Sequence, residues 1–296
     1  MCGILGIISK SAKLEQERLE AMQQTMPYRG PDDNGCWFNS TKTVALSHLR
    51  LSILDPRPSG KQPMIDDDAG LYISYNGEVY NFIEIREELE KLGYSFKTGT
   101  DTEVILRAYQ EYGKDCLSHF NGMFAIAIWD ENNQSLFIAR DRLGIKPVYY
   151  LENEEEFVFS SETKAILEGL SKKPEINKHL IDSFMSYGYI PGEETLHKGI
   201  KRLLPGHFAV ISEGQVEISQ YWDLKLDNSE DKGFEYYQNK GKKLLESAID
   251  LRLRSDVPLG IFLSGGIDSS AVVGLLAPKV DKPLKTFSIG YDYGQN

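Results

Sequence analysis

Apolar and polar positions predict alternating strand-like and helix-like stretches over the first two hundred or so positions. The chain opens with MCGILGIIS, where the residues after Cys2 carry no charge, a pattern typical of a buried strand. Such a strand would hold the amino terminus in place, whereas most chain ends are loose. Five further stretches rich in β-branched and aromatic residues are expected to be strands, namely 43–54, 71–81, 123–130, 135–141 and 156–161.

Apolar residues recur at helical spacing in two places between these strands. The first is 82–92, where Asn81 and Glu84 are placed like a capping box, and the second is 104–112, which ends before Gly113. The helices form a pair and do not follow each strand in turn. We therefore expect stacked sheets with helices outside them.

The pattern changes after a polar, acidic stretch at 224–235. A long helix to about Arg254 is followed by LGIFLS, a helix of small residues and LKTFSIG. Strand, helix and strand in this order predict the start of a parallel α/β domain, and one such unit cannot bury both faces of its sheet. We place a first domain at 2–212, a linker at 213–232 and part of a second domain at 233–296.

Composition narrows the possible partners. The net charge of −11, from 33 basic and 44 acidic residues, argues against nucleic acid or an anionic membrane. The apolar runs are too short to cross a bilayer, and no signal peptide is evident. The three cysteines Cys2, Cys36 and Cys116 are scattered and predict neither a disulfide framework nor a zinc site. We expect a reduced, cytoplasmic protein.

The segment LSGGIDSS, Leu263 to Ser270, combines a buried strand, two glycines and three hydroxyls before a helix. Glycines let the backbone approach an anion, and hydroxyls with helix N-terminal amides bind its oxygens. The alternative is an ordinary turn capped by Asp268 or Ser269. We favour phosphate or pyrophosphate binding.

Cys2 has two interpretations. It is either a small hydrophobe leading a strand or, once Met1 is removed, a nucleophile whose own α-amine is the base. An α-amine titrates near 7.7–8.0 and can accept a proton at neutral pH.

Three other segments contain residues that could assist such a nucleophile. In YNGEVYN, Asn76 and Gly77 are either a hairpin turn or two neutral donors of an oxyanion hole. Arg50 is either a surface strand residue or a bidentate carboxylate clamp. Asp101 is either a helix N-cap or a partner for a substrate ammonium group.

The segments RGPDDNG, LRLSI, YNGEVYN, TGTDTE and RDRLGIKPVYY follow Cys2 in the order seen in class II glutamine amidotransferases. With LSGGIDSS and FSIG, the chain resembles the glutamine-hydrolysing asparagine synthetases. The resemblance implies an N-terminal-nucleophile fold of class α+β, an αββα sandwich. It also implies the start of an α/β parallel-sheet ATP-pyrophosphatase domain after the sandwich.

For the first domain, the resemblance implies that Cys2 attacks the glutamine amide while Asn76 and Gly77 hold the oxyanion. Arg50 would bind the α-carboxylate of glutamine, and Asp101 and Glu78 its α-ammonium. The backbone would line the pocket at Leu51, Ser52, Ile53 and Leu54. The motifs RGPDDNG and RDRLGIKPVYY are expected to shape the domain, with no catalytic role.

For the second domain, the resemblance implies ATP-dependent adenylation of aspartate, then amidation by ammonia to asparagine, with release of AMP and pyrophosphate. Leu263 and Ile289 would flank the nucleotide, and Asp268 would help to hold Mg²⁺. The pyrophosphate would be wrapped by Ser264, Gly265, Gly266, Asp268, Ser269 and Ser270. A homodimer is compatible with the resemblance.

Family members continue well beyond FSIG with the aspartate pocket and further ligands. As a complete polypeptide the chain is expected to hydrolyse glutamine without synthesis, and as a fragment it would share the activity of its parent. The alternatives are amidotransferases that act on sugar phosphates or on another carboxylate, and a non-catalytic scaffold that binds glutamine.

Overall fold

The computed structural model describes residues 1–226, 230–280 and 283–290, and the chain divides into two compact units, Met1–Leu224 and Lys225–Asn296. The first unit ends later than the expected position 212. Strand β12 (Gln215–Gln220) pairs with β11 (His207–Ser212) and so completes a sheet of the first unit. The expected start of the linker at 213 is thereby corrected.

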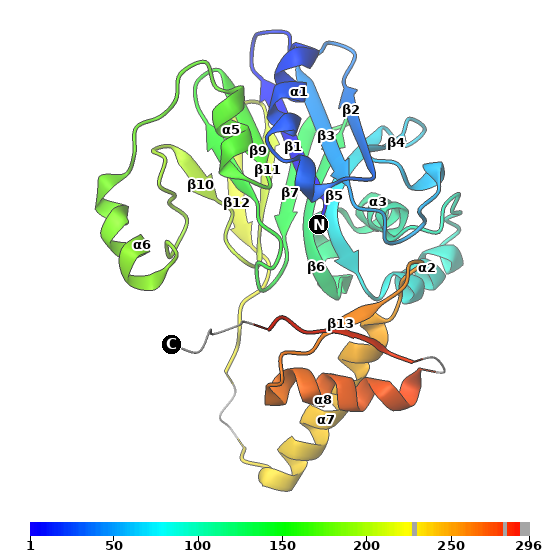
Figure 1. Cartoon of the computed structure of the whole chain (residues 1–296). Coiled ribbons are helices and arrows are strands. Elements are labelled where there is room, and N and C mark those ends of the chain that lie inside the picture. The colour runs from blue at the N-terminus through cyan, green and yellow to red at the C-terminus, as the bar shows by residue number, and fades with distance from the viewer. Residues whose placement is uncertain (227–229, 281–282, 291–296) are drawn as a thin grey trace. The chain divides into compact units, whose positions relative to one another are not determined.

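The first unit is built on two six-stranded antiparallel sheets (Figure 1). The first sheet runs in the order β10 (Ile200–Arg202), β8 (Tyr149–Glu152), β9 (Glu156–Ser160), β1 (Gly3–Ser9), β3 (Val44–Arg50) and β2 (Asp33–Phe38). The second runs in the order β12, β11, β7 (Ser135–Arg140), β6 (Gly122–Asp130), β5 (Leu71–Val79) and β4 (Met64–Asp66). The strand at the amino terminus is therefore central in its sheet.

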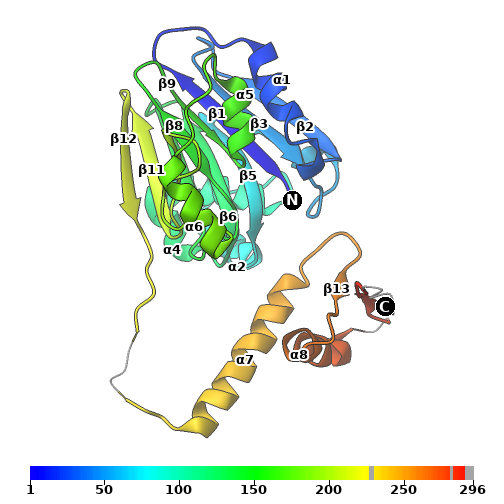
Figure 2. The ribbon, with the colours of Figure 1, turned by 60° about the vertical axis from the view of Figure 1, so that its left-hand side comes forward.

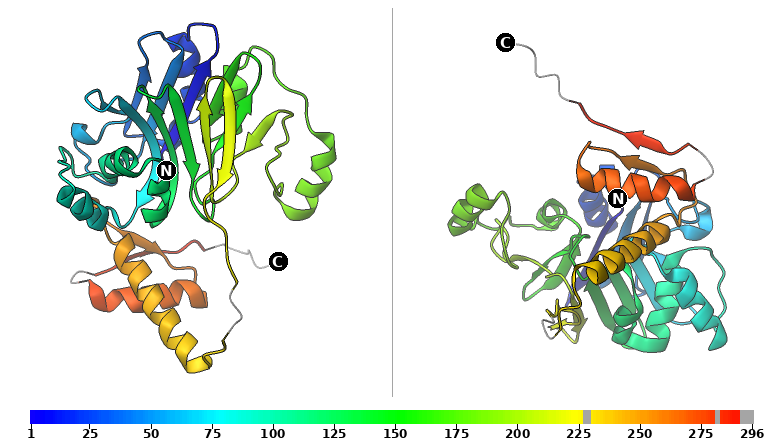
Figure 3. Two further views of the ribbon diagram at one scale, coloured as in Figure 1. Left: turned by 180° about the vertical axis from the view of Figure 1, so that it is seen from behind. Right: turned by 90° about the horizontal axis from the view of Figure 1, so that it is seen from below.

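Helices cover the outer face of each sheet (Figures 2 and 3). The first sheet packs against α1 (Gln16–Gln24) and α5 (Thr163–Gly169). The second packs against α2 (Phe82–Lys91), α3 (Asp101–Tyr112) and α4 (Cys116–His119). Helix α6 (Ile181–Tyr187) precedes β10 in the chain. The expected αββα sandwich is confirmed.

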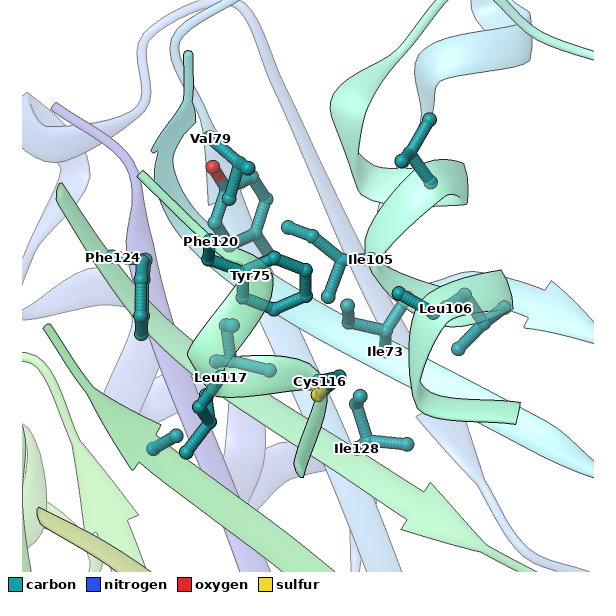
Figure 4. Packing of buried hydrophobic residues seen from close by; sticks show 14 of the residues in the cluster. Ile73, Tyr75, Val79, Ile105, Leu106, Cys116, Leu117, Phe120, Phe124 and Ile128 are labelled. Atoms are coloured by element: carbon teal, nitrogen blue, oxygen red, sulfur yellow. The ribbon is translucent and has the colours of Figure 1, made fainter. Parts of the chain in front are cut away.

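Successive side chains of a strand point to opposite faces of its sheet, so neighbouring residues contribute to different hydrophobic cores. In β6, Ala125 and Ala127 face the core between the sheets, whereas Ile126 and Ile128 face the core beneath the helices. Figure 4 shows the second of these cores, where Cys116 packs among apolar side chains. Burial raises the pKa of the Cys116 thiol, and the residue acts as a small hydrophobe.

Two predictions from local sequence patterns are wrong, a helix cap and a hairpin turn. Asn81 does not cap α2, because its side chain accepts from the N–H of Asn121 over 2.8 Å and donates to the carbonyl of His119 over 2.9 Å. The predicted capping box is wrong for this reason. The hairpin interpretation of Asn76 and Gly77 is wrong as well, since both lie inside β5 and pair with β6.

The second unit contains α7 (Phe234–Arg252), β13 (Gly260–Phe262), α8 (Ile267–Leu276) and β14 (Lys285–Phe287). Strands β13 and β14 pair in parallel, with Gly260 opposite Lys285. The expected strand–helix–strand unit is confirmed.

Candidate active site

A pocket in the first unit is lined by residues at the start of β1 and the ends of β3 and β5. It brings together most of the residues predicted to act on glutamine: Cys2, Arg50, Leu51, Ile53, Leu54, Asn76, Gly77, Glu78 and Asp101. Ser52 is not among the lining residues, and its N–H instead donates to the Asp32 carboxylate over 2.8 Å. The lining also includes residues that the sequence did not point to: Met1, Gly60, Gln62, Tyr75, Thr100, Thr102, Met123 and Lys146.

Cys2 precedes β1, whose pairing with β3 brings its sulfur to the end of that strand. The N–H of Leu51 donates to Sγ of Cys2 over 3.3 Å, and Sγ lies 3.5 Å from the Leu51 carbonyl oxygen. Burial raises the pKa of the thiol, while the Leu51 N–H and the positive charges of Lys146 and Arg50 oppose that rise. The sulfur is thus held in one place beside groups that favour the thiolate.

Arg29, from the motif RGPDDNG, fixes the backbone of the same residue. Its Nε donates to the carbonyl oxygen of Cys2 over 2.9 Å, and its Nη1 pairs with Glu162 over 2.9 Å. Arg29 is buried, and its Nη2 has no hydrogen-bond partner among the described residues. The sequence interpretation gave this motif only a shaping role, and the contact is a direct one to Cys2.

Asn76 presents an unpaired amide to the pocket. Its side chain is 1% exposed, and its Nδ2 finds no hydrogen-bond partner within the part of the chain that the structure describes. A buried donor without an acceptor costs about 1–3 kcal/mol. A ligand oxygen would relieve that cost, so the unpaired amide indicates a place for one.

Gly77 is next to Asn76 and has no room for a side chain. A Cβ there would collide with the carbonyl oxygen of Met123 on β6. Glycine is therefore required for β5 and β6 to approach each other at the pocket.

Arg50 supports the pocket wall. Its guanidinium donates to the carbonyl oxygens of Leu54 at 3.1 Å, Asp55 at 2.7 Å and Arg57 at 3.3 Å, and Gly60 lies against it. The side chain is buried, not on the surface, so the surface-strand alternative is wrong.

Asp101 is the first residue of α3, while the N-cap is Thr100, which accepts from the N–H of Glu103 over 3.2 Å. The N-cap interpretation of Asp101 is therefore wrong. Its Oδ2 accepts from the hydroxyl of Tyr75 at 2.7 Å and from the N–H of Val79 at 3.0 Å. Burial raises the pKa of Asp101 to about 6. A positively charged ligand would therefore stabilise the ionised carboxylate of Asp101.

In the second unit, the segment from Leu263 to Ser270 joins β13 to α8. Gly265 has φ +81, and Gly266 is the N-cap of α8 without a side-chain hydrogen bond, so the alternative of a turn capped by Asp268 or Ser269 is wrong. Ser264 and Ser269 join through their hydroxyls at 3.1 Å.

The remaining residues predicted to bind nucleotide lie beside this segment. Asp268 and Ser270 lie in the first turn of α8, and Ile289 follows β14 with its side chain exposed. Hydroxyls and open helix N–H groups together suit phosphate oxygens. Across the described ranges, no three His, Cys, Asp or Glu side chains gather as a metal site.

Comparison with known families places both units. Residues 1–222 match the family "Glutamine amidotransferase domain", and residues 240–296 match the family "Asparagine synthase". A Methanocaldococcus jannaschii protein with the provisional name glutamine-hydrolysing asparagine synthetase 2 is 40% identical over 316 residues, covering 99% of this chain and 60% of that protein. The Bacillus subtilis glutamine-hydrolysing asparagine synthetase 3 is 38% identical over 302 residues, covering 99% of this chain and 48% of that enzyme.

Among solved structures, the glutamine phosphoribosylpyrophosphate amidotransferase of B. subtilis superposes with a TM-score of 0.55 at 18% identity, over 99% of this chain and 67% of that one. This likeness concerns the fold alone. The chain spans about half to three-fifths of the length of the two synthetases above. None of the helices described here has the length and apolarity needed to cross a membrane.

Proposed function

The chain belongs to the glutamine amidotransferase family, and from that membership we propose that its first unit hydrolyses glutamine with Cys2 as the nucleophile. The observation that carries the proposal is the unpaired Nδ2 of Asn76, which lines the same pocket as Cys2. In an acyl-transfer reaction the carbonyl oxygen of the substrate becomes an oxyanion, which could accept a hydrogen bond from this Nδ2.

The chemistry requires removal of Met1, which frees the α-amine of Cys2 as the base. The thiol proton passes to this amine, and sulfur bonds to the side-chain carbonyl carbon of glutamine. The Nδ2 of Asn76 and the N–H of Gly77 hold the resulting oxyanion. The amine then returns its proton as the C–N bond breaks, and ammonia leaves. Water hydrolyses the thioester, which releases glutamate and restores the thiol.

Recognition of glutamine is assigned to the charged groups of the pocket. We propose that Arg50 binds the α-carboxylate and that Asp101 with Glu78 binds the α-ammonium. The buried Asp101 supports this assignment, because an ammonium group offsets the cost of ionising it. The backbone of residues 51–54 would complete the wall.

We propose that the second unit serves an asparagine synthetase, in which ammonia amidates ATP-activated aspartate to give asparagine, AMP and pyrophosphate. The names of the relatives and the match of residues 240–296 support this assignment. Leu263 and Ile289 would flank the nucleotide. The pyrophosphate would contact residues 264–266 and 268–270, with the Asp268 carboxylate as one ligand of Mg²⁺. We assign the protein to the cytoplasm.

The deciding experiment measures glutamate release from glutamine by the purified chain, with intact mass to establish loss of Met1. Cys2→Ala is compared with Cys36→Ala, whose cysteine is exposed and does not line the pocket. Activity lost in Cys2→Ala and kept in Cys36→Ala supports the proposal. Equal turnover by Cys2→Ala and the unmutated chain, or a mature protein that keeps Met1 and still turns over, would overturn it.

A further inference from the structure

A buried lysine lines the same pocket as Cys2. Lys146 is 5% exposed, and within the described ranges its Nζ forms neither a hydrogen bond nor an ion pair. Lysine is almost never fully buried unless it is paired, because removing its charge from water is costly. The side chain of Lys146 is therefore largely removed from water in the pocket that holds Cys2.

The backbone around Lys146 is fixed independently of its side chain. Its N–H donates to Oδ2 of Asp141 over 2.9 Å, and its carbonyl oxygen accepts from Nε of Arg140 over 2.8 Å. Nη1 of Arg140 in turn donates to the carbonyl oxygen of Leu203 over 2.7 Å. The position of the lysine should therefore survive replacement of its side chain.

The charges around the nucleophile come from several elements. The thiol of Cys2 lies in the positive fields of Lys146 and Arg50. The α-amine of Met1 lies in the positive fields of Arg29 and Lys146 and in the negative field of Asp32. Lys146 itself lies in the fields of Cys2 and of three further charged groups, Glu78, Asp141 and Arg29.

The fields act on Lys146 and on the α-amine of Met1 as follows from the signs of the charges. Burial lowers the pKa of Lys146, while Glu78 favours its charged form. In the chain that still carries Met1, Lys146 and Arg29 both add to the lowering of the pKa of the Met1 α-amine, whose largest cause is burial.

We infer that Lys146 is a positioning residue whose fixed charge favours the thiolate of Cys2 and, once Met1 is removed, the neutral form of the Cys2 α-amine at neutral pH. The inference rests on the proposed glutaminase function and adds to it an electrostatic control of the nucleophile. A nearby cation disfavours an ammonium and favours a thiolate. The effect on the thiol stabilises the thiolate that proton transfer leaves, and the effect on the amine keeps it able to accept the thiol proton.

The test follows alkylation of Cys2 by iodoacetamide against pH, without glutamine. All variants carry Cys36→Ala, so that Cys2 is the reactive thiol while Cys116 is buried. Lys146→Met removes the charge and keeps an unbranched side chain, Lys146→Arg restores the charge, and Lys173→Met removes a charge from an exposed position. Intact mass shows that Met1 has been removed, and thermal melting shows that each variant is folded.

In Lys146→Met, the midpoint of the alkylation profile should rise by about 1 pH unit, which makes alkylation about tenfold slower at pH 7. Lys146→Arg and Lys173→Met should follow the parent profile. An unshifted midpoint in folded Lys146→Met, or an equal shift in Lys173→Met, would overturn the inference. If Lys146→Met proves unfolded, Lys146→Gln takes its place under the same criteria.

Glutamate release separates this inference from the function on which it rests. A shifted alkylation midpoint in a chain that never releases glutamate would support the control by Lys146 and count against the glutaminase. Glutamate release with the same alkylation midpoint in all variants would support the glutaminase and overturn the role of Lys146.

Discussion

Arg29 holds Cys2 by its backbone, because the Arg29 Nε donates to the carbonyl oxygen of Cys2 over 2.9 Å. The other end of the guanidinium is anchored on Glu162. The residue that would attack the substrate is therefore fixed on both sides, by Arg29 at its carbonyl and by Leu51 at its sulfur.

Arg29→Lys should lower kcat for glutamine hydrolysis by about 10²-fold, since lysine cannot make both bonds and a small displacement of the nucleophile is costly. KM should change little, because Arg29 does not line the pocket. Steady-state kinetics check this split. The matched control is Arg18→Lys, which weakens a similar pair with Glu156. A rise in KM alone would contradict the prediction.

Asn76→Ala should lower kcat by about 10²–10³-fold, because one donor to the oxyanion is lost. The change in unfolding free energy should be small, since the native amide nitrogen is unpaired. Asn39→Ala is the control, because the side chain of Asn39 is paired: its Oδ1 accepts from the N–H groups of Thr43 and Val44. That control should lose about 1–3 kcal/mol of stability and keep its kcat. Urea unfolding and kinetics measure both quantities.

Asp101→Asn should weaken glutamine binding while leaving the fold intact. The amide oxygen can accept the same two hydrogen bonds from Tyr75 and Val79, but the charge that would meet an ammonium is gone. A charge-assisted hydrogen bond contributes about 1.5–3 kcal/mol, so KM should rise by about 10–100-fold. An unchanged KM would remove Asp101 from glutamine recognition.

The pH dependence of stability offers a separate check on Asp101. Its pKa in the fold is about 6, above the reference of 3.8, so its contribution to stability is complete below pH 3.8 and is lost as pH rises through 6. Asp101→Asn has no such loss. Its stability relative to the parent should therefore grow by about 2.5 kcal/mol between pH 4 and pH 7.5, as measured by urea unfolding. A stability difference between Asp101→Asn and the parent that does not change with pH would show that burial does not raise the pKa of Asp101.

Gly77→Ala should lose both stability and turnover, because its Cβ meets the backbone of β6 at Met123. Overpacking of this kind typically costs about 1–3 kcal/mol. Gly99→Ala is the control in the same unit, since the nearest atoms to its Cβ lie at 3.7 Å and 3.8 Å. Thermal melting and glutamate release should distinguish the two. Equal behaviour of both variants would refute the steric account.

The residues with the clearest local signals could be picked out from the sequence, and their roles stay predictions. Cys2, Asn76 and Asp101 stand in short motifs whose order resembles one family, and the structure brings all three to one pocket. Strands β1, β3, β5, β6, β7 and β9 were visible because their β-branched and aromatic residues leave few alternatives. Strands β8 and β11 also contribute side chains to the core between the sheets but were not predicted. The family expected from these motifs is confirmed by the match of residues 1–222.

What the sequence missed depends on contacts between distant segments. Strand β12 was taken as linker because its polar, largely exposed residues look like a loop until β11 pairs with them. Asn81 looked like a helix cap and instead binds Asn121. Lys146 lies in RDRLGIKPVYY, which was given only a shaping role, because burial of a lysine is decided by the walls of a pocket that local patterns do not describe.

The central place of β1 has a consequence for how the chain is made. The strand pairs with β3 on one side and with β9, residues 156–160, on the other. During translation, the residues of β1 are synthesised well before those of β9, its second neighbour. Strand β1 thus cannot complete its pairing until β9 has been synthesised. A stalled or truncated product that lacks β9 would carry the Cys2 thiol without the site that surrounds it.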